Sequence, residues 1–159
     1  MKKLLLPLLT VLVASGCSTV PVLTQDSPEL QTTQSFSAVD DKAVIYLYRD
    51  REANFGLFEL EIHIDDEDVN TYPACYRRFE LEPGNYFFEA DHPDVFGFED
   101  EMDFTAKAGE VSYFEYLPIA RFGIPGETKI VAKTAEETQQ LIREQDLCVN
   151  PIVQLKARD

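Results

Sequence analysis

The chain has few basic residues, few histidines and no tryptophan, and its shortage of positive charge excludes one class of function. There are 14 Lys and Arg residues against 29 Asp and Glu residues, so the formal net charge is −15 at pH 7. Nucleic acid is excluded as a partner, because its phosphate backbone binds to basic surfaces. Apolar residues still make up 45% of the 159 positions, which indicates one folded domain rather than a disordered acidic segment.

The scarcity of histidine also limits the chemistry that the sequence predicts. His63 and His92 are the only two histidines, and neither has a second His or Cys at the spacing of a zinc site. A catalytic cysteine would need a nearby base, and Ser112 lacks the Gly-x-Ser-x-Gly pattern of hydrolases. We therefore predict no catalytic residue, no cofactor and no metal, and a protein that is not an enzyme.

The N-terminal apolar run, Leu4–Val13, is too short to cross a bilayer and ends at Ala14-Ser15-Gly16-Cys17. This segment resembles the lipobox of bacterial lipoproteins, in which the leader is removed before the cysteine and fatty-acyl chains such as palmitate are attached there. The resemblance implies a signal peptide over residues 1–16 and lipidation of Cys17. The alternative is an ordinary secretory peptide that ends in an incidental cysteine.

The lipoprotein interpretation predicts where the mature chain lies. Removal of residues 1–16 would leave 12 basic and 29 acidic residues, a net charge of −17. Ser18 resembles the sorting residue of lipoproteins exported to the outer membrane, so we expect a lipid-anchored protein of the bacterial cell envelope that faces the periplasm. Over residues 17–41 we expect the lipidated Cys17 that the resemblance implies, followed by a flexible tether that the richness in Ser, Thr, Gln and Pro predicts.

Residues 42–159 carry the pattern of a β-domain. Ala43–Tyr48 is apolar on both faces, as in a central strand, and Phe58–Asp65 alternates strictly between apolar and polar residues. Further short segments separated by turns such as Pro83-Gly84 continue to Lys133. We predict a mostly β fold, an antiparallel β-sandwich of about seven strands.

One C-terminal helix is predicted after the strands. Thr134-Ala135-Glu136-Glu137 has the pattern of a capping box, and the helix should end near Leu147. We expect this helix to cover an open edge or end of the sheet, where it would protect unpaired backbone groups.

Three segments carry a family resemblance, namely Ala43–Arg49, Leu81–Tyr86 and Lys107–Phe114. They resemble the bacterial lipoproteins of the family called domain of unknown function 2846, and the resemblance spans roughly residues 42–145. It implies a secreted, lipid-anchored β-sandwich without an assigned activity. The chain departs from the family at Asp65-Asp66-Glu67-Asp68, where the family tends to carry an Asp-Gly hairpin turn.

Two cysteines remain beyond Cys17. Cys75 and Cys148 form an even number in an oxidising compartment, which favours a disulfide between them. Such a bridge would close a loop of about 70 residues and stabilise the fold by about 2–4 kcal/mol. The alternative is two buried free thiols.

Acidic residues are concentrated in the middle of the chain. Residues 59–103 contain 15 acidic residues and only two arginines. Like charges that face each other across a sheet repel, so either the register separates them or a cation compensates them. A solvated acidic face is the simpler interpretation, and calcium is the alternative. The calcium candidates are Asp65, Asp66, Asp68, Asp94, Asp100 and Glu101.

Aromatic residues beside glycines predict a binding surface. If the strands alternate in direction, loops 65–68, 91–100 and 118–127 share one end of the sandwich. The candidate partner-binding residues are Phe96, Phe98, Phe122 and Ile124. The alternative is that these side chains fold back and plug the open end of the sandwich.

Together these patterns predict a non-catalytic binding or structural accessory of the envelope that meets another envelope protein. The alternative is a small enzyme or ligand-binding module that acts on a cell-wall or sugar substrate. Such an enzyme needs paired carboxylates in a cleft, and no pair stands out in the sequence.

Overall fold

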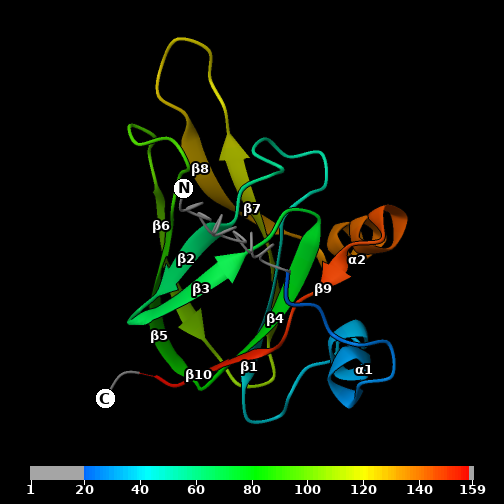
Figure 1. Cartoon of the computed structure of the whole chain (residues 1–159). Coiled ribbons are helices and arrows are strands. Elements are labelled where there is room, and N and C mark those ends of the chain that lie inside the picture. The colour runs from blue at the N-terminus through cyan, green and yellow to red at the C-terminus, as the bar shows by residue number, and fades with distance from the viewer. Residues whose placement is uncertain (1–19, 158–159) are drawn as a thin grey trace, which may run out of the picture.

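Two β-sheets and two helices make up residues 20–157, the part of the chain that the computed structural model describes (Figure 1). The predicted signal peptide (residues 1–16), Cys17 and Ser18 lie outside this part. Within it, neither helix is long and apolar enough to cross a membrane.

The first sheet has six strands, with the order β10-β4-β1-β7-β8 and with β9 also paired to β4. Its strands are β1 (Ala43–Tyr48), β4 (Cys75–Leu81), β7 (Val111–Ile119), β8 (Glu127–Lys133), β9 (Cys148–Val149) and β10 (Val153–Leu155). Strand β1 runs antiparallel to β4 and parallel to β7, while β9 and β10 run parallel to β4. This sheet is therefore mixed.

The second sheet is antiparallel, with the order β3-β2-β5-β6. Its strands are β2 (Leu60–Ile64), β3 (Glu67–Thr71), β5 (Gly84–Ala90) and β6 (Asp100–Ala106). Its apolar side chains, such as Ile62 and Phe88, face the mixed sheet and form the main core with Ile45 and Phe79. Its other face carries the acidic residues and is open to solvent.

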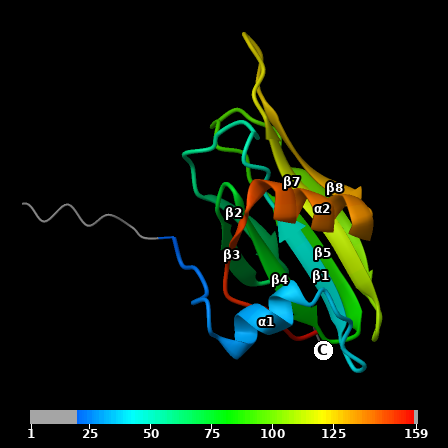
Figure 2. The same cartoon turned by 90° about the vertical axis from the view of Figure 1, so that its right-hand side faces the viewer.

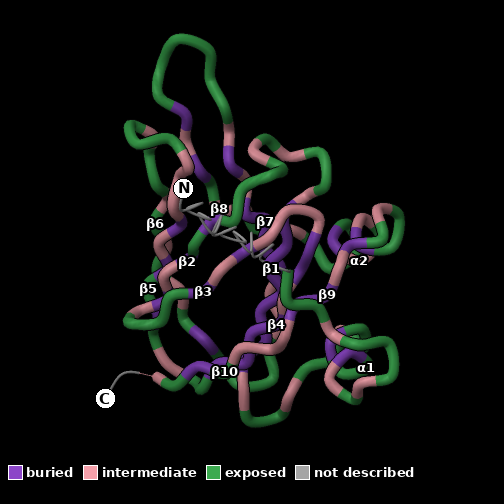
Figure 3. The backbone as a smooth tube through the Cα atoms, viewed as in Figure 1, coloured by how far each residue is buried: buried purple, intermediate pink, exposed green. Residues whose placement is uncertain are grey.

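Strand β1 is buried along its whole length because both faces of the mixed sheet are covered. Ile45 and Leu47 point into the core between the sheets, whereas Tyr46 and Tyr48 pack in a second cluster beneath the helices. Figure 3 shows this continuous burial along β1, and Figure 2 shows both helices on the same side of the mixed sheet. The prediction of a central strand apolar on both faces is confirmed.

The predicted fold class is confirmed in its main features, a mostly β domain with two sheets and a C-terminal helix. The strands number ten rather than about seven, and the first sheet is mixed rather than purely antiparallel. The additional strands include β9 and β10, which are only two and three residues long. Alternation of side chains reports burial, but it does not distinguish a parallel from an antiparallel neighbour.

The flexible tether predicted for residues 17–41 is wrong for residues 20–41. Helix α1 (Pro28–Gln34) begins after the N-cap Ser27, whose side chain accepts a hydrogen bond from the Leu30 amide. Leu30 is buried, and the ring of Phe36 packs 4.9 Å from that of Tyr46. Proline at the first helical position favours a start here, but seven residues are too few to show a periodic apolar face in the sequence.

Helix α2 (Ala135–Gln145) begins with the predicted capping box. The Thr134 side chain accepts a hydrogen bond from the Glu137 amide, and the Glu137 carboxylate accepts one from the Thr134 amide. The prediction that this helix covers an open edge or end of the sheet is wrong. The helix packs on the outer face of the mixed sheet, where Ile142 contacts the tyrosine cluster. Strands β1, β4 and β7 place tyrosine rings on that face. Helix α2 therefore buries more apolar surface there than it would at the edge of the sheet.

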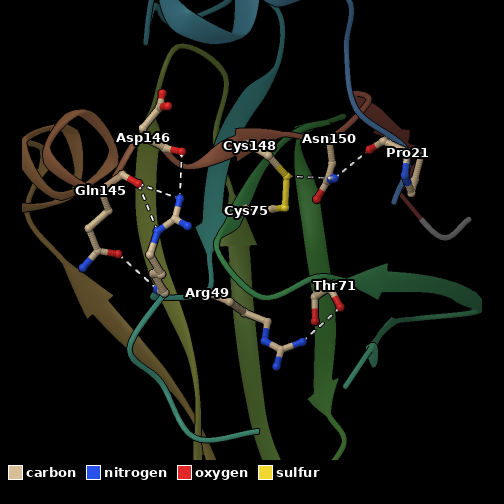
Figure 4. Close-up of a disulfide and its surroundings, with 9 residues drawn as sticks. Pro21, Arg49, Thr71, Cys75, Gln145, Asp146, Cys148 and Asn150 are labelled. Atoms are coloured by element: carbon tan, nitrogen blue, oxygen red, sulfur yellow. Dashed lines mark hydrogen bonds between the residues drawn. A yellow bond between two sulfur atoms is a disulfide. The ribbon is translucent and has the colours of Figure 1, made fainter. Parts of the chain in front are cut away.

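The predicted disulfide between Cys75 and Cys148 is present and joins β4 to β9 (Figure 4). The two cysteines face each other in register across these parallel strands. Nearby, the Asn150 side chain donates a hydrogen bond to the Pro21 carbonyl at 2.8 Å, which attaches the N-terminal segment to the same region. The bridge therefore fastens the segment after α2 to the middle of the mixed sheet.

Candidate functional site

Two neighbouring loops present the four residues that the sequence assigned to partner binding. Phe96 is 78% exposed, Phe122 is fully exposed, and Phe98 and Ile124 are more than half exposed. The Phe98 amide donates to the Gly126 carbonyl at 3.0 Å, which joins loop 91–100 to loop 118–127. These four side chains, called here the loop-end patch, do not fold back as plugs.

His92 holds the loops of this end together. Its ring lies so close to Gly97 and Gly126 that a β-carbon at either glycine would fall within 2.6 Å of a ring atom. Its Nδ1 accepts a hydrogen bond from the Asp94 amide, and its ring meets that of Phe55 edge-on at 5.2 Å. The loop around Phe55 therefore belongs to this end of the molecule.

Loop 65–68 lies at the opposite end, which corrects the prediction that it joins loops 91–100 and 118–127. The Asp65 amide donates to the Phe87 carbonyl at 2.9 Å, and the Phe87 amide donates to Asp65 Oδ1 at 3.0 Å. Because β2 is antiparallel to β5, with Ile64 at its end opposite Phe88, β2 runs toward the beginning of β5, whereas loop 91–100 follows the end of β5.

The calcium candidates are consequently divided and do not form one site. Asp65, Asp66 and Asp68 lie around the turn between β2 and β3, whereas Asp94, Asp100 and Glu101 lie around the start of β6. Asp100 accepts a hydrogen bond from the Ile130 amide at 2.7 Å, and Asp68 contacts His63.

A compact group of acidic residues surrounds His63 on the open face of the antiparallel sheet. His63 Nδ1 lies 2.7 Å from Asp68 Oδ1 and its Nε2 lies 3.2 Å from Asp91 Oδ1. Asp68 on β3 lies opposite His63 on β2. Glu61 precedes His63 by two positions and lies on the same face of β2. One ligand atom each from Glu61, His63 and Asp91 lie within 4.8 Å of one another. These four residues are called here the His63 cluster.

The two carboxylates favour the protonated imidazole of His63, because carboxylates only accept hydrogen bonds. The hydrogen bond to Asp68, followed by the charge of Asp91, raises the pKa of His63. In the strand register, Glu89 of β5 lies directly opposite His63 of β2 on one side and Glu101 of β6 on the other. The register therefore brings like charges together, contrary to the interpretation that it separates them.

Tyr116 of β7 positions two members of the His63 cluster from inside the core. Its side chain is fully buried, and its hydroxyl lies within hydrogen-bonding distance of the Glu61 and Asp91 carbonyls. Burial raises the pKa of Tyr116, so the hydroxyl remains a donor. Thr128 also donates to the Asp91 carbonyl at 2.8 Å, and the Asp91 amide donates to the Glu61 carbonyl. The backbone beneath both carboxylates is thus held by both sheets.

An open hollow of about 520 Å³ borders the His63 cluster. Glu61 and Asp91 line it together with Phe58 and His92. Glu61 is exposed and Asp91 is partly exposed, so both carboxylates are accessible from solvent.

Arg49, the last residue of the first family-like segment, is buried and holds the loop that borders this hollow. Its guanidinium donates to the carbonyls of Phe55, Phe58 and Thr71 at 2.8–3.2 Å and lies over the ring of Tyr116. Burial lowers the pKa of Arg49 to about 10, so it remains charged at neutral pH. Figure 4 shows its contact with Thr71.

The buried acids of the described residues have structural partners. Glu80 pairs with Arg78 and Lys42, and Glu115 pairs with Lys133. These carboxylates lie in the mixed sheet and do not line the hollow.

A scan against protein-family models finds no match to this chain, and a search of curated proteins finds none either.

The sequence does not predict His63 as a metal ligand, because no second His or Cys lies at metal-ligand spacing. One sequence pattern could have indicated the cluster. The alternation Glu61-x-His63 places both side chains on one face of a strand, and Asp68 follows a short turn at the start of the next strand. Asp91 is 28 residues away, so only the pairing of β2 with β5 brings it to His63.

Proposed function

We propose that this chain is a lipid-anchored protein of the bacterial cell envelope that acts as a non-catalytic binding module. In this proposal residues 1–16 are a signal peptide, Cys17 carries the lipid, and the domain faces the periplasm from the outer membrane. The resemblance to the domain of unknown function 2846 lipoproteins supports this location. The disulfide between Cys75 and Cys148 is also typical of an oxidising compartment.

The exposure of the loop-end patch is the observation that carries the binding role. Large apolar side chains that are exposed together at one end of a small domain mark surfaces that meet another molecule, and aromatic residues dominate such contacts. Phe96, Phe98, Phe122 and Ile124 lie on loops that His92 and backbone hydrogen bonds hold together. A surface held in this way loses little conformational entropy on binding.

The charge around the patch defines the chemistry of the partner. Asp94, Glu99 and Asp100 lie on the same loop as Phe96 and Phe98, and the chain as a whole is strongly acidic. We expect an envelope protein with an apolar groove bordered by basic residues, because opposite charges around the rim accelerate and orient the encounter.

A ligand-binding role is the second candidate, supported by the hollow beside Glu61 and Asp91. Its volume of about 520 Å³ is within the range of small-molecule sites. Hydrolysis of a sugar would need one carboxylate held away from water, and Glu61 is exposed. The exposure of Glu61 therefore favours ligand binding over catalysis.

Site-specific photo-crosslinking in intact cells tests the binding role. A photoreactive phenylalanine analogue at Phe122 should give one defined crosslinked protein, whereas the same analogue at Glu136, exposed on α2, should not. Identical products from both positions, or products with lipid alone, would contradict the proposal.

The anchor is tested separately by labelling with a palmitate analogue. The wild-type chain should incorporate the label and sediment with membranes, and Cys17→Ser should do neither. Equal labelling of both chains would rule out Cys17 as the lipid site.

A further inference from the structure

We propose that Glu61, His63 and Asp91 form a binding site for one divalent metal ion of the zinc type. Asp68 acts as a positioning residue that orients the imidazole. This inference uses the His63 cluster rather than the loop-end patch, so it stands independently of the proposed partner binding.

The ligand set favours a transition metal over calcium. One imidazole nitrogen and two carboxylates are ligands of zinc and its neighbours in the first transition row, whereas calcium prefers oxygen ligands alone. Zinc bonds of about 2.0–2.2 Å place neighbouring ligand atoms roughly 3–4 Å apart. The ligand atoms already lie within 4.8 Å of one another, and the exposed Glu61 side chain is free to close the remaining gap.

Asp68 gives His63 the orientation that metal-binding histidines have. Such residues donate their second ring N–H to a carboxylate or carbonyl, which fixes the ring and makes the ligating nitrogen more basic. Asp68 Oδ1 lies 2.7 Å from Nδ1, and this leaves Nε2 directed at Asp91.

The site is organised before any ion binds. The buried hydroxyl of Tyr116 and the side chain of Thr128 fix the carbonyls beneath Glu61 and Asp91, while His63 lies on the regular strand β2. Ligands on rigid elements with supporting hydrogen bonds lose little entropy when they coordinate an ion.

The hollow provides access and an open coordination position. It borders Glu61 and Asp91, so an ion held by three protein ligands would face solvent or a further ligand on that side. Three protein ligands with one open position is the arrangement of zinc sites that exchange water or bind a substrate.

Charge on the surrounding face favours a dication. Glu89 faces His63 in the register and also faces Glu101, and Glu99 lies beside Glu89 and Asp91. Like charges directly opposed across a sheet are destabilising, and a bound divalent cation would reduce that repulsion.

Calorimetric titration with zinc chloride tests the site. The full chain, purified in detergent without a histidine tag and treated with a chelator, should bind one equivalent of Zn²⁺. His63→Gln and Glu61→Gln should each weaken binding at least tenfold. Asp68→Asn should weaken it about 10–100-fold while retaining one-to-one stoichiometry, as expected of a positioning residue.

The matched control is Asp103→Asn, which removes the same charge from an exposed position on β6 outside the cluster. It should leave the affinity unchanged within about twofold, because diffuse charge contributes far less than coordination. Co²⁺ should give a ligand-field absorption band in the wild type that His63→Gln removes, and circular dichroism should show that every variant is folded.

Three results would overturn the inference. The first is a wild-type chain that binds no Zn²⁺ with saturation at one equivalent. The second is a folded His63→Gln chain with wild-type affinity. The third is a loss on Asp103→Asn as large as that on Glu61→Gln, which would show that the face attracts cations only through its total charge.

Discussion

Tyr116 connects the two sheets through a single hydroxyl group. The residue belongs to the mixed sheet, but its hydroxyl reaches the carbonyls of Glu61 and Asp91 in the antiparallel sheet and its following loop. A buried hydrogen bond contributes to stability, so this contact stabilises the fold and also places the His63 cluster, beside the donors that the Asp91 amide and Thr128 provide to the same carbonyls.

Tyr116→Phe keeps the ring and removes that hydroxyl. We expect the free energy of unfolding to fall by about 0.5–1.5 kcal/mol, because a buried hydrogen bond is lost while the Glu61 and Asp91 carbonyls keep the Asp91 amide and Thr128 as donors. Urea unfolding followed by circular dichroism measures the loss. Tyr113→Phe is the control, since the Tyr113 hydroxyl only accepts a long bond of 3.3 Å from Gln139, and an equal loss in both variants would contradict the argument.

His92 has a structural role, because its ring joins the loops at one end of the molecule. Its ring fills the space between Gly97 and Gly126, and a β-carbon at Gly126 would lie 2.5 Å from the ring and 2.6 Å from the Ile119 carbonyl. Both glycines were visible in the sequence as loop residues, but the ring that requires glycine at position 126 comes from a different loop.

At the scale of elements, Gly126→Ala should separate the β7–β8 hairpin from loop 91–100. Overpacking of this kind costs about 1–3 kcal/mol, and backbone amides near Phe98 should exchange faster with deuterium. Gly56→Ala is the control, because its β-carbon would meet only the Ala53 carbonyl at 3.7 Å. Similar exchange at Phe98 in both variants would show that the close packing at Gly126 is unimportant.

Helix α2 should respond to pH through its capping box. Hydrogen bonds from the Thr134 side chain and backbone lower the pKa of Glu137 below its ordinary value of 4.5. A group whose pKa is lowered by folding stabilises the fold above its ordinary pKa and loses that contribution as the pH falls through the folded pKa.

We therefore expect the melting temperature of the wild-type chain to fall more steeply below pH 4.5 than that of Glu137→Gln. Melting curves recorded between pH 3 and pH 7 test this expectation, and the exposed Glu136→Gln serves as the control. Parallel curves for the wild type and Glu137→Gln would mean that the capping carboxylate does not contribute.

Local sequence patterns predicted some elements well and missed others for physical reasons. The alternation in β2 and the capping box of α2 are local signals, and both appear in the structure as predicted. Helix α1 was missed because Ser, Thr and Gln dominate it, and its stability comes from Leu30 packing beneath the mixed sheet's tyrosines. Short helices of this kind depend on tertiary contacts more than on propensity.

The molecule as a whole has three layers, with helices on one face of the mixed sheet and the antiparallel sheet on the other. The Cys75–Cys148 bridge closes a sequence separation of 73 residues and joins β9 to the middle of the mixed sheet. It therefore restrains both the segment after α2 and, through Asn150 and Pro21, the N-terminal segment.

Replacement of both cysteines by alanine should lower the free energy of unfolding by about 2–4 kcal/mol, because the unfolded chain regains the freedom of a long closed loop. Guanidinium unfolding of the double variant beside the oxidised and the reduced wild type measures this effect. The reduced wild type should resemble the double variant. Equal stability of all three chains would show that the bridge is dispensable.

The sequence by itself determined which segments form the main strands and the C-terminal helix, and it favoured a disulfide between Cys75 and Cys148 over two free thiols. These features follow from side-chain periodicity, a capping motif and the small number of cysteines. Only the tertiary structure decided that the first sheet is mixed, which loops share an end, and that Glu61, His63 and Asp91 meet. Those outcomes depend on strand pairing between distant segments, and no local pattern records which segments pair.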